Sequence, residues 1–145
     1  MKRHSIVFTA PGRAELQTSE MAEPELKRDE VLLETECTLV SPGTERACLL
    51  GLAGGEFPKY LGYSAVAKVL RAGEEAGFLP GERVAVYHSM HTSRLVKQTQ
   101  DLVRIDDDAL PAHTAVFAIV ASMGLQGVRK ARPEFGESLV VMGLG

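Results

Sequence analysis

The stretch S-P-G-T-E at residues 41–45 decides the fold of this 145-residue chain, because it ends the longest strand-like run, residues 30–40. Pro42 fixes its own φ and has no N–H to donate, so a sheet ladder is expected to stop there. Gly43 permits a positive φ or the close approach of another backbone. The stretch therefore predicts a strand end followed by a turn.

Thr44 and Glu45 present a hydroxyl and a carboxylate at this strand end, where loops often carry chemistry. The plainer alternative is an ordinary turn in which Ser41 or Thr44 caps one or two helical turns over residues 46–50. Short motifs recur by chance, so the choice between the two depends on the rest of the chain.

Composition is that of an ordinary globular protein with one good hydrophobic core, since 45% of the residues are apolar and 24% are charged. The net charge of −3 gives no reason to expect nucleic acid or an anionic membrane as a partner. No apolar run reaches the length that spans a bilayer, and the run after Met1 is too short for a signal peptide. Cys37 and Cys48 are expected to be reduced, buried thiols, which favours a cytoplasmic location.

Short β-type runs separated by Gly and Pro turns continue as far as Asp106, and this pattern predicts an all-β barrel. The expected strands cover residues 5–9, 14–18, 31–40, 65–70, 83–87, 94–98 and 101–105. Beyond Asp106, apolar residues at mixed helical spacing predict two helices, residues 111–121 and 123–132.

The last residues combine an apolar run, residues 138–142, with Gly143-Leu144-Gly145. A buried strand that leads into G-x-G is how a dinucleotide-binding βαβ unit begins. The remaining glycine, the phosphate-binding helix and the ribose-binding acid would follow Gly145. We therefore expect this chain to be the front part of a longer protein.

The order of these pieces resembles the medium-chain dehydrogenase/reductase superfamily, the zinc-type alcohol dehydrogenases and their relatives. The motifs that carry the resemblance are S-P-G-T-E, L-G-Y-S before V-A-K-V, P-G-E-R-V-A-V, and the terminal V-V-M-G-L-G. It spans nearly the whole chain. It implies a mostly β fold with C-terminal helices: a GroES-like catalytic domain (residues 1–110), connecting helices (111–137) and the start of a truncated Rossmann domain (138–145).

The resemblance also implies the activity. The full-length protein would be an NAD(P)-dependent oxidoreductase that transfers hydride between nicotinamide and a carbonyl, alcohol or activated alkene. This fragment alone would be inactive, because most of the cofactor site lies elsewhere. The expected partner is a small-molecule substrate, and a homodimer formed through the loose strand or an exposed barrel edge is a further possibility. The competing hypothesis is a GroES-like binding or assembly module without redox chemistry.

The family's zinc ligands are missing from the matching positions. The cysteine ligand falls on Pro42, the histidine ligand on Tyr63, and the third ligand on Ala118 or Ile119. Catalytic zinc needs about three protein ligands. We therefore expect NAD or NADP as the cofactor and no zinc.

Two catalytic residues follow from the resemblance. Thr44 matches the position whose hydroxyl relays the substrate proton, and the phenol of Tyr63 could donate a hydrogen bond to a substrate oxygen. Tyr63 could equally fill the volume that the metal and histidine leave. Glu45 matches the acid that supports the metal site, and without a metal it is expected to pair with a cation such as Arg83.

The expected cofactor-binding residues are Ser122, beside the nicotinamide ring, and the two terminal glycines, Gly143 and Gly145. Met123 is the alternative to Ser122, although core packing is the plainer role for a methionine. His88 and His91 could line the cleft, but we expect exposed loop histidines.

Overall fold

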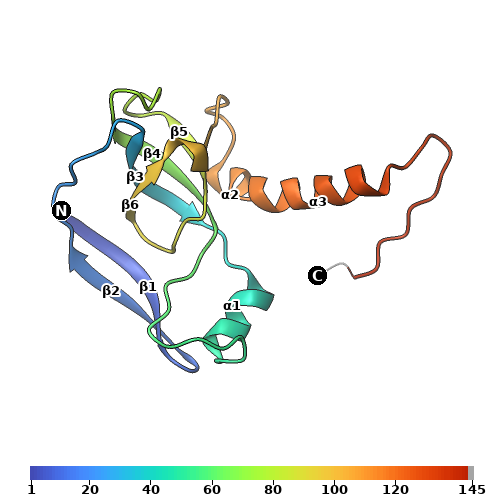
Figure 1. Ribbon diagram of the computed structural model, residues 1–145, viewed down its shortest axis with the longest axis horizontal. Helices are drawn as coiled ribbons and strands as arrows, with labels where there is room; N and C mark the ends of the chain where they lie inside the picture. Colours follow the sequence, from blue (N-terminus) through green and yellow to red (C-terminus); the bar gives the residue numbers. More distant parts are fainter. Residues whose placement is uncertain (144–145) are drawn as a thin grey trace.

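The computed structural model describes residues 1–143, and within this range the chain forms a β body with helices on one side (Figure 1). The strands are β1 (Lys2–Ala10), β2 (Arg13–Glu20), β3 (Glu30–Thr38), β4 (Ser64–Ala72), β5 (Arg83–Tyr87), β6 (Arg94–Gln98) and β7 (Leu102–Arg104). The helices are α1 (Pro42–Leu49), α2 (Ala112–Ala115) and α3 (Ala118–Ala131), and the 3-10 turn η1 (Thr99–Asp101) precedes β7.

Within the described residues, an antiparallel five-stranded sheet, ordered β6-β3-β4-β5-β7, forms the centre of the body. The hairpin β1-β2 is a separate two-stranded sheet, and isolated bridges join Ser5 to Thr92 and Phe8 to Lys59, which lie in connections of the body. The mostly β fold that the sequence predicts, with strands at the expected places, is therefore confirmed.

The first half of strand β4, residues 64–67, is buried on both of its faces, which explains why it carries Ala65, Val66 and Ala67 in a row. Val69 belongs to the main core with the fully buried side chains of Val31, Leu33, Val84 and Val86. Val66 faces the other way and packs with Ala115 and Val116, at and just after the end of α2. The helices therefore begin against the sheet and not as a separate unit.

The C-terminal region differs from the sequence prediction in two ways. The break between the helices lies at residues 116–117, not near Ser122, because the buried Ala115 and Val116 fix α2 against the sheet and α3 starts afresh at Ala118. Residues 138–142 form no strand, because no described residue pairs with them, and a strand needs a partner ladder.

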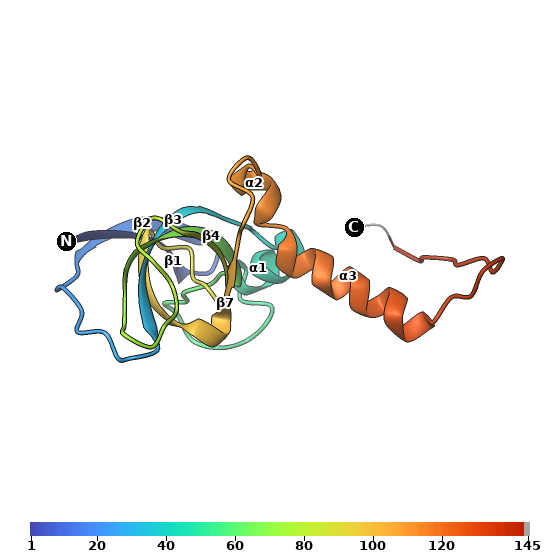
Figure 2. The same ribbon diagram turned by 90° about the horizontal axis from the view of Figure 1, so that it is seen from above.

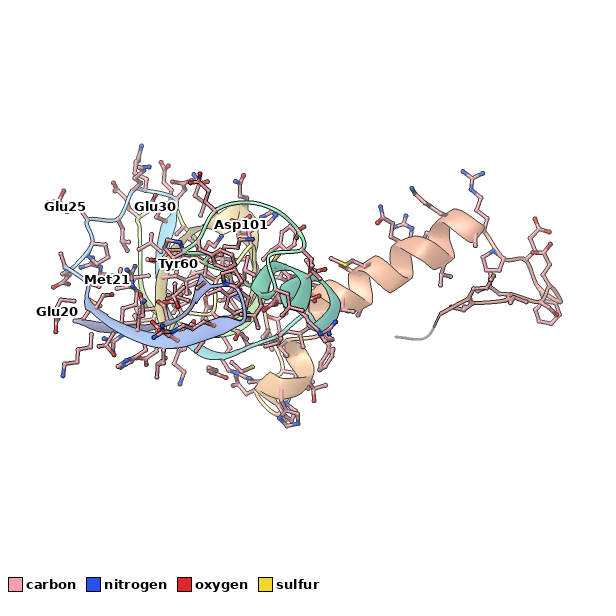
Figure 3. All side chains as sticks on the ribbon, turned by 90° about the horizontal axis from the view of Figure 1, so that it is seen from below. Glu20, Met21, Glu25, Glu30, Tyr60 and Asp101 are labelled. Carbon is pink, nitrogen blue, oxygen red and sulfur yellow. The ribbon has the colours of Figure 1, made fainter. Side chains whose placement is uncertain are left out.

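Helix α3 points away from the β body, and none of its residues is buried (Figure 2). Its far half and the chain that follows stand clear of the sheet, whereas Glu20, Met21 and Glu25 lie at the other end of the molecule (Figure 3). Among the described helices, none has both the length and the apolar character needed to cross a membrane.

Candidate functional site

Residues 41–45 form the start of a helix at the end of a strand. β3 ends at Thr38, Ser41 takes the extended N-cap position of α1, and Pro42 occupies the first helical turn, where its missing N–H is no loss. Ser41 makes no side-chain cap, but the Glu45 carboxylate reaches back and accepts the Ser41 backbone N–H at 2.8 Å. Glu45 thus caps the helix start from one position beyond that of a capping box, and the contact fixes one of its oxygens.

The start of α1 faces a pocket of about 380 Å³. Thr44 and Tyr63, which the sequence assigns as catalytic residues, both line it. Met123 reaches the same pocket from α3, and the full lining is Ser41, Thr44, Glu45, Leu61, Gly62, Tyr63 and Met123. The structure thus brings together residues that lie far apart in the sequence, and their roles stay predictions.

Glu45, which lines this pocket, forms a buried acid–histidine pair with His91. Glu45 is 6% exposed and His91 is 7% exposed, and the Glu45 Oε2 lies 2.8 Å from His91 Nε2. The other ring nitrogen, Nδ1, lies 2.7 Å from the Thr38 hydroxyl oxygen. An ionised Glu45 can only accept, so Nε2 must then carry the proton of that hydrogen bond.

Two sequence predictions are wrong at this pair. Glu45 does not pair with Arg83, which instead contacts Glu36 at 3.3 Å and donates to the Leu110 carbonyl at 2.9 Å. His91 is not an exposed loop histidine, because its loop packs against residues 61–62 and leaves the side chain buried. His88 is exposed as expected, with Nδ1 at 3.4 Å from Asp101.

The burial of His91 comes from contacts that its neighbours in sequence do not reveal. The His91 backbone N–H donates to the Leu61 carbonyl at 2.8 Å. Gly62 has φ of +121°, and a Cβ at this position would come within 2.9 Å of the His91 nitrogen and the Ser89 carbonyl oxygen. The glycine that precedes Tyr63 is the signal that could have suggested a close backbone crossing.

The predicted cofactor residues occupy different surroundings. The Ser122 hydroxyl donates to the Ile119 carbonyl at 2.7 Å and lines a neighbouring hollow of about 530 Å³ with Tyr87 and Asp101, outside the pocket of Thr44 and Tyr63. Met123 borders both hollows. Gly143 has φ of +83°, a conformation that suits glycine, and Gly145 lies outside the described residues.

The pocket does not suit a catalytic zinc ion. Pro42 offers no ligand atom, and no group of three His, Cys, Asp or Glu side chains that could hold a metal occurs in residues 1–143. Among the described residues that line the pocket, Glu45 alone is of these types, and its oxygens already serve Ser41 and His91. Three ligands are needed, so a zinc-free site stays a prediction that this donor set supports.

Outside the pocket, the pKa values of Cys37 and Asp101 are shifted by their immediate surroundings. Cys37 and Cys48 are only partly buried, so the expectation that both thiols are buried is wrong. Desolvation still raises the pKa of the Cys37 thiol, which makes Cys37 a poor nucleophile. Burial would also raise the pKa of Asp101, but hydrogen bonds from Lys97 and His88 outweigh it and lower that pKa.

The chain has the fold of the GroES-like N-terminal domain of medium-chain dehydrogenases and reductases, and known members of that superfamily resemble it, as the sequence predicts. No protein-family model matches it. The 2-desacetyl-2-hydroxyethyl bacteriochlorophyllide A dehydrogenase of Cereibacter sphaeroides is 29% identical over 156 residues, which cover 92% of this chain and 48% of that protein.

Two solved structures show the same fold. An Escherichia coli oxidoreductase/dehydrogenase of unknown specificity has a TM-score of 0.77 and 17% identity, covering 94% of this chain and 49% of that one. A structure from Sinorhizobium meliloti, assigned as a zinc-binding dehydrogenase and bound to NADP, has a TM-score of 0.72 and 18% identity, covering 90% and 46%. The chain thus spans about half the length of the proteins it matches.

Proposed function

We propose that this chain is the N-terminal catalytic part of an NAD(P)-dependent, zinc-free oxidoreductase that acts on a small carbonyl, alcohol or activated alkene. The observation that carries the proposal is the pocket of about 380 Å³ in which Thr44, Tyr63 and Glu45 meet without a set of metal ligands. The names of the matched proteins, which are dehydrogenases and oxidoreductases, support the same reaction class.

The pocket residues supply what a metal would otherwise supply. A nicotinamide cofactor supplies the hydride when bound. The Tyr63 phenol and the Thr44 hydroxyl donate hydrogen bonds to the substrate oxygen, which stabilises the negative charge that develops there. Met123 lines the pocket from α3 and adds an apolar side chain beside the reacting atoms.

We propose that the full-length protein supplies the rest of the cofactor site. NADP bound to the Sinorhizobium meliloti protein supports NAD or NADP as the cofactor. We assign residues 1–110 to the catalytic domain, residues 111–137 to the connection, and the terminal residues with Gly143 and Gly145 to the start of the nucleotide-binding domain. Ser122 is assigned to the cofactor side of α3, and the cytoplasm is the proposed location.

The test uses the full-length protein with nicotinamide cofactor and a panel of quinones, aldehydes, alcohols and enones. We expect Tyr63→Phe to lower kcat by about 10²-fold or more, because it removes the donor to the substrate oxygen and keeps the ring. Tyr60→Phe is the matched control, since Tyr60 is exposed and does not line the pocket. Wild-type turnover by Tyr63→Phe would contradict the assignment.

Metal analysis by mass spectrometry checks the zinc-free part of the proposal. The purified full-length protein should contain far less than one zinc per chain, and a chelator should leave turnover unchanged. One tightly held zinc per chain, lost together with activity, would overturn it.

A further inference from the structure

Three described side chains connect the candidate substrate pocket with a second hollow. Glu45 lines the pocket of Thr44 and Tyr63, whereas His91 and Thr38 line a hollow of about 220 Å³ that shares no lining residue with it. The connection runs from Glu45 Oε2 to His91 Nε2 over 2.8 Å, and from His91 Nδ1 to the Thr38 hydroxyl over 2.7 Å.

Every group on this connection can carry a proton. An imidazole can take up a proton at one nitrogen and release one at the other, and a hydroxyl both donates and accepts. The carboxylate has one oxygen on His91, while the Ser41 N–H holds the other. An unbroken chain of hydrogen bonds therefore runs between two hollows, through the buried Glu45 and His91 to the half-buried Thr38.

We propose that Glu45, His91 and Thr38 form a proton path between the substrate pocket and the second hollow. The proposal rests on the proposed function, because a hydride transfer to or from a substrate must be balanced by a proton. Glu45 is the pocket end of the path. His91 and Thr38 act through it and touch no substrate.

The transfers balance in both directions. Reduction of a carbonyl would place on its carbon the hydride that a bound nicotinamide would supply, and as the C=O π bond opens its oxygen would need one proton, which Tyr63 or Thr44 would give. Water in the pocket would carry a proton from Glu45 to that hydroxyl, and Glu45 would take a proton from His91 Nε2. His91 regains a proton at Nδ1 from the Thr38 hydroxyl, and water in the second hollow reprotonates Thr38. These transfers leave the ring protonated at Nδ1, so a rotation of the imidazole that again turns a protonated nitrogen toward Glu45 completes the cycle. Oxidation of an alcohol runs the same steps in reverse.

If Glu45 and His91 served only to stabilise the fold, His91 would not need a hydrogen bond to the Thr38 hydroxyl. Thr35, on the same strand, offers a comparison, because it lines the same second hollow but its buried hydroxyl has no hydrogen-bond partner among residues 1–143. Thr38 and Thr35 therefore form a matched pair of positions, one on the path and one beside it.

The first test needs no turnover. In the ¹⁵N-labelled chain, NMR measures how fast the His91 ring N–H exchanges with water. We expect Thr38→Val to slow this exchange about tenfold or more, because one hydrogen-bonded step is removed. Thr35→Val should leave the rate unchanged, and Thr38→Ser should restore it. Unchanged exchange in Thr38→Val, or equal slowing in Thr35→Val, would overturn the path; Thr38→Ala replaces Thr38→Val if the latter does not fold.

The second test uses the full-length protein. Thr38→Val should lower kcat and raise the solvent isotope effect on kcat, while KM for the cofactor stays constant; Thr35→Val should change neither. If kcat and the isotope effect stay at the wild-type values, the path does not serve the reaction. If the exchange responds but no nicotinamide-dependent turnover is found, the path stands and the proposed function fails.

Discussion

Gly62 joins the substrate pocket to the loop that carries His91, and its backbone leaves no room for a side chain. We predict that Gly62→Ala lowers the free energy of unfolding by about 2–4 kcal/mol, since strain at φ of +121° adds to contacts of 2.9 Å with backbone atoms of Ser89 and His91. Chemical denaturation measures the loss.

Gly77 is the matched control for this substitution. It also has a positive φ, +70°, but no atom lies within 4 Å of the Cβ that an alanine would add. Gly77→Ala should therefore lose only the strain contribution, about 1–2 kcal/mol. Equal losses at the two positions would show that the close approach of Gly62 does not matter.

The same residue explains how far the sequence could specify the site. Thr44 and Tyr63 could be assigned to one cleft, because S-P-G-T-E and L-G-Y-S match motifs of the superfamily that the sequence resembles. The partner of Glu45 could not, because His91 stands in a polar connection whose burial depends on the chain crossing at residues 61–62. A partner chosen by charge alone, Arg83, was therefore wrong.

At the scale of elements, α3 is held by its first turns alone, so its stability depends on intrinsic helix propensity. Gly124 and Gly127 lie inside it with open space where a Cβ would be. We predict that Gly124→Ala and Gly127→Ala each stabilise the helix by about 0.5–1 kcal/mol and raise the helical signal in far-UV circular dichroism. Ala121→Gly in the same helix should lower that signal, and a lower signal in either alanine variant would contradict the prediction.

Elements with local signals were predicted well, and those that depend on tertiary contact were not. β5 and β6 match their expected ranges, because Pro80-Gly81 precedes β5 and polar residues follow β5 and flank β6 on the sequence. The predicted position of the helix break was wrong, because it depends on the burial of Ala115 and Val116 against Val66 of β4. The neighbouring sequence carries no signal of that contact. The apolar run at residues 138–142 has strand composition, but a strand also needs a neighbour to pair with.

At the scale of the whole molecule, apolar surface collects on the part of the chain that leaves the β body. Val140 is 85% exposed and Met142 is 92% exposed, and the exposed apolar residues of this region also include Phe135, Leu139 and Val141. Contiguous exposed apolar surface usually marks a contact that another polypeptide covers. In a purified sample of this chain, the polypeptide that can cover this surface is a second copy of the same chain.

We therefore predict that the isolated 145-residue chain associates with itself as its concentration rises, measured by sedimentation velocity. Replacing both Val140 and Met142 by Lys should weaken this association, because each apolar side chain removed from a contact forfeits about 1.5–3 kcal/mol, a factor of roughly ten or more in Kd. Leu79→Lys is the control, since Leu79 is exposed on a loop of the β body. Association that falls equally in the control would place the contact on the β body, and a chain that stays monomeric throughout would exclude it.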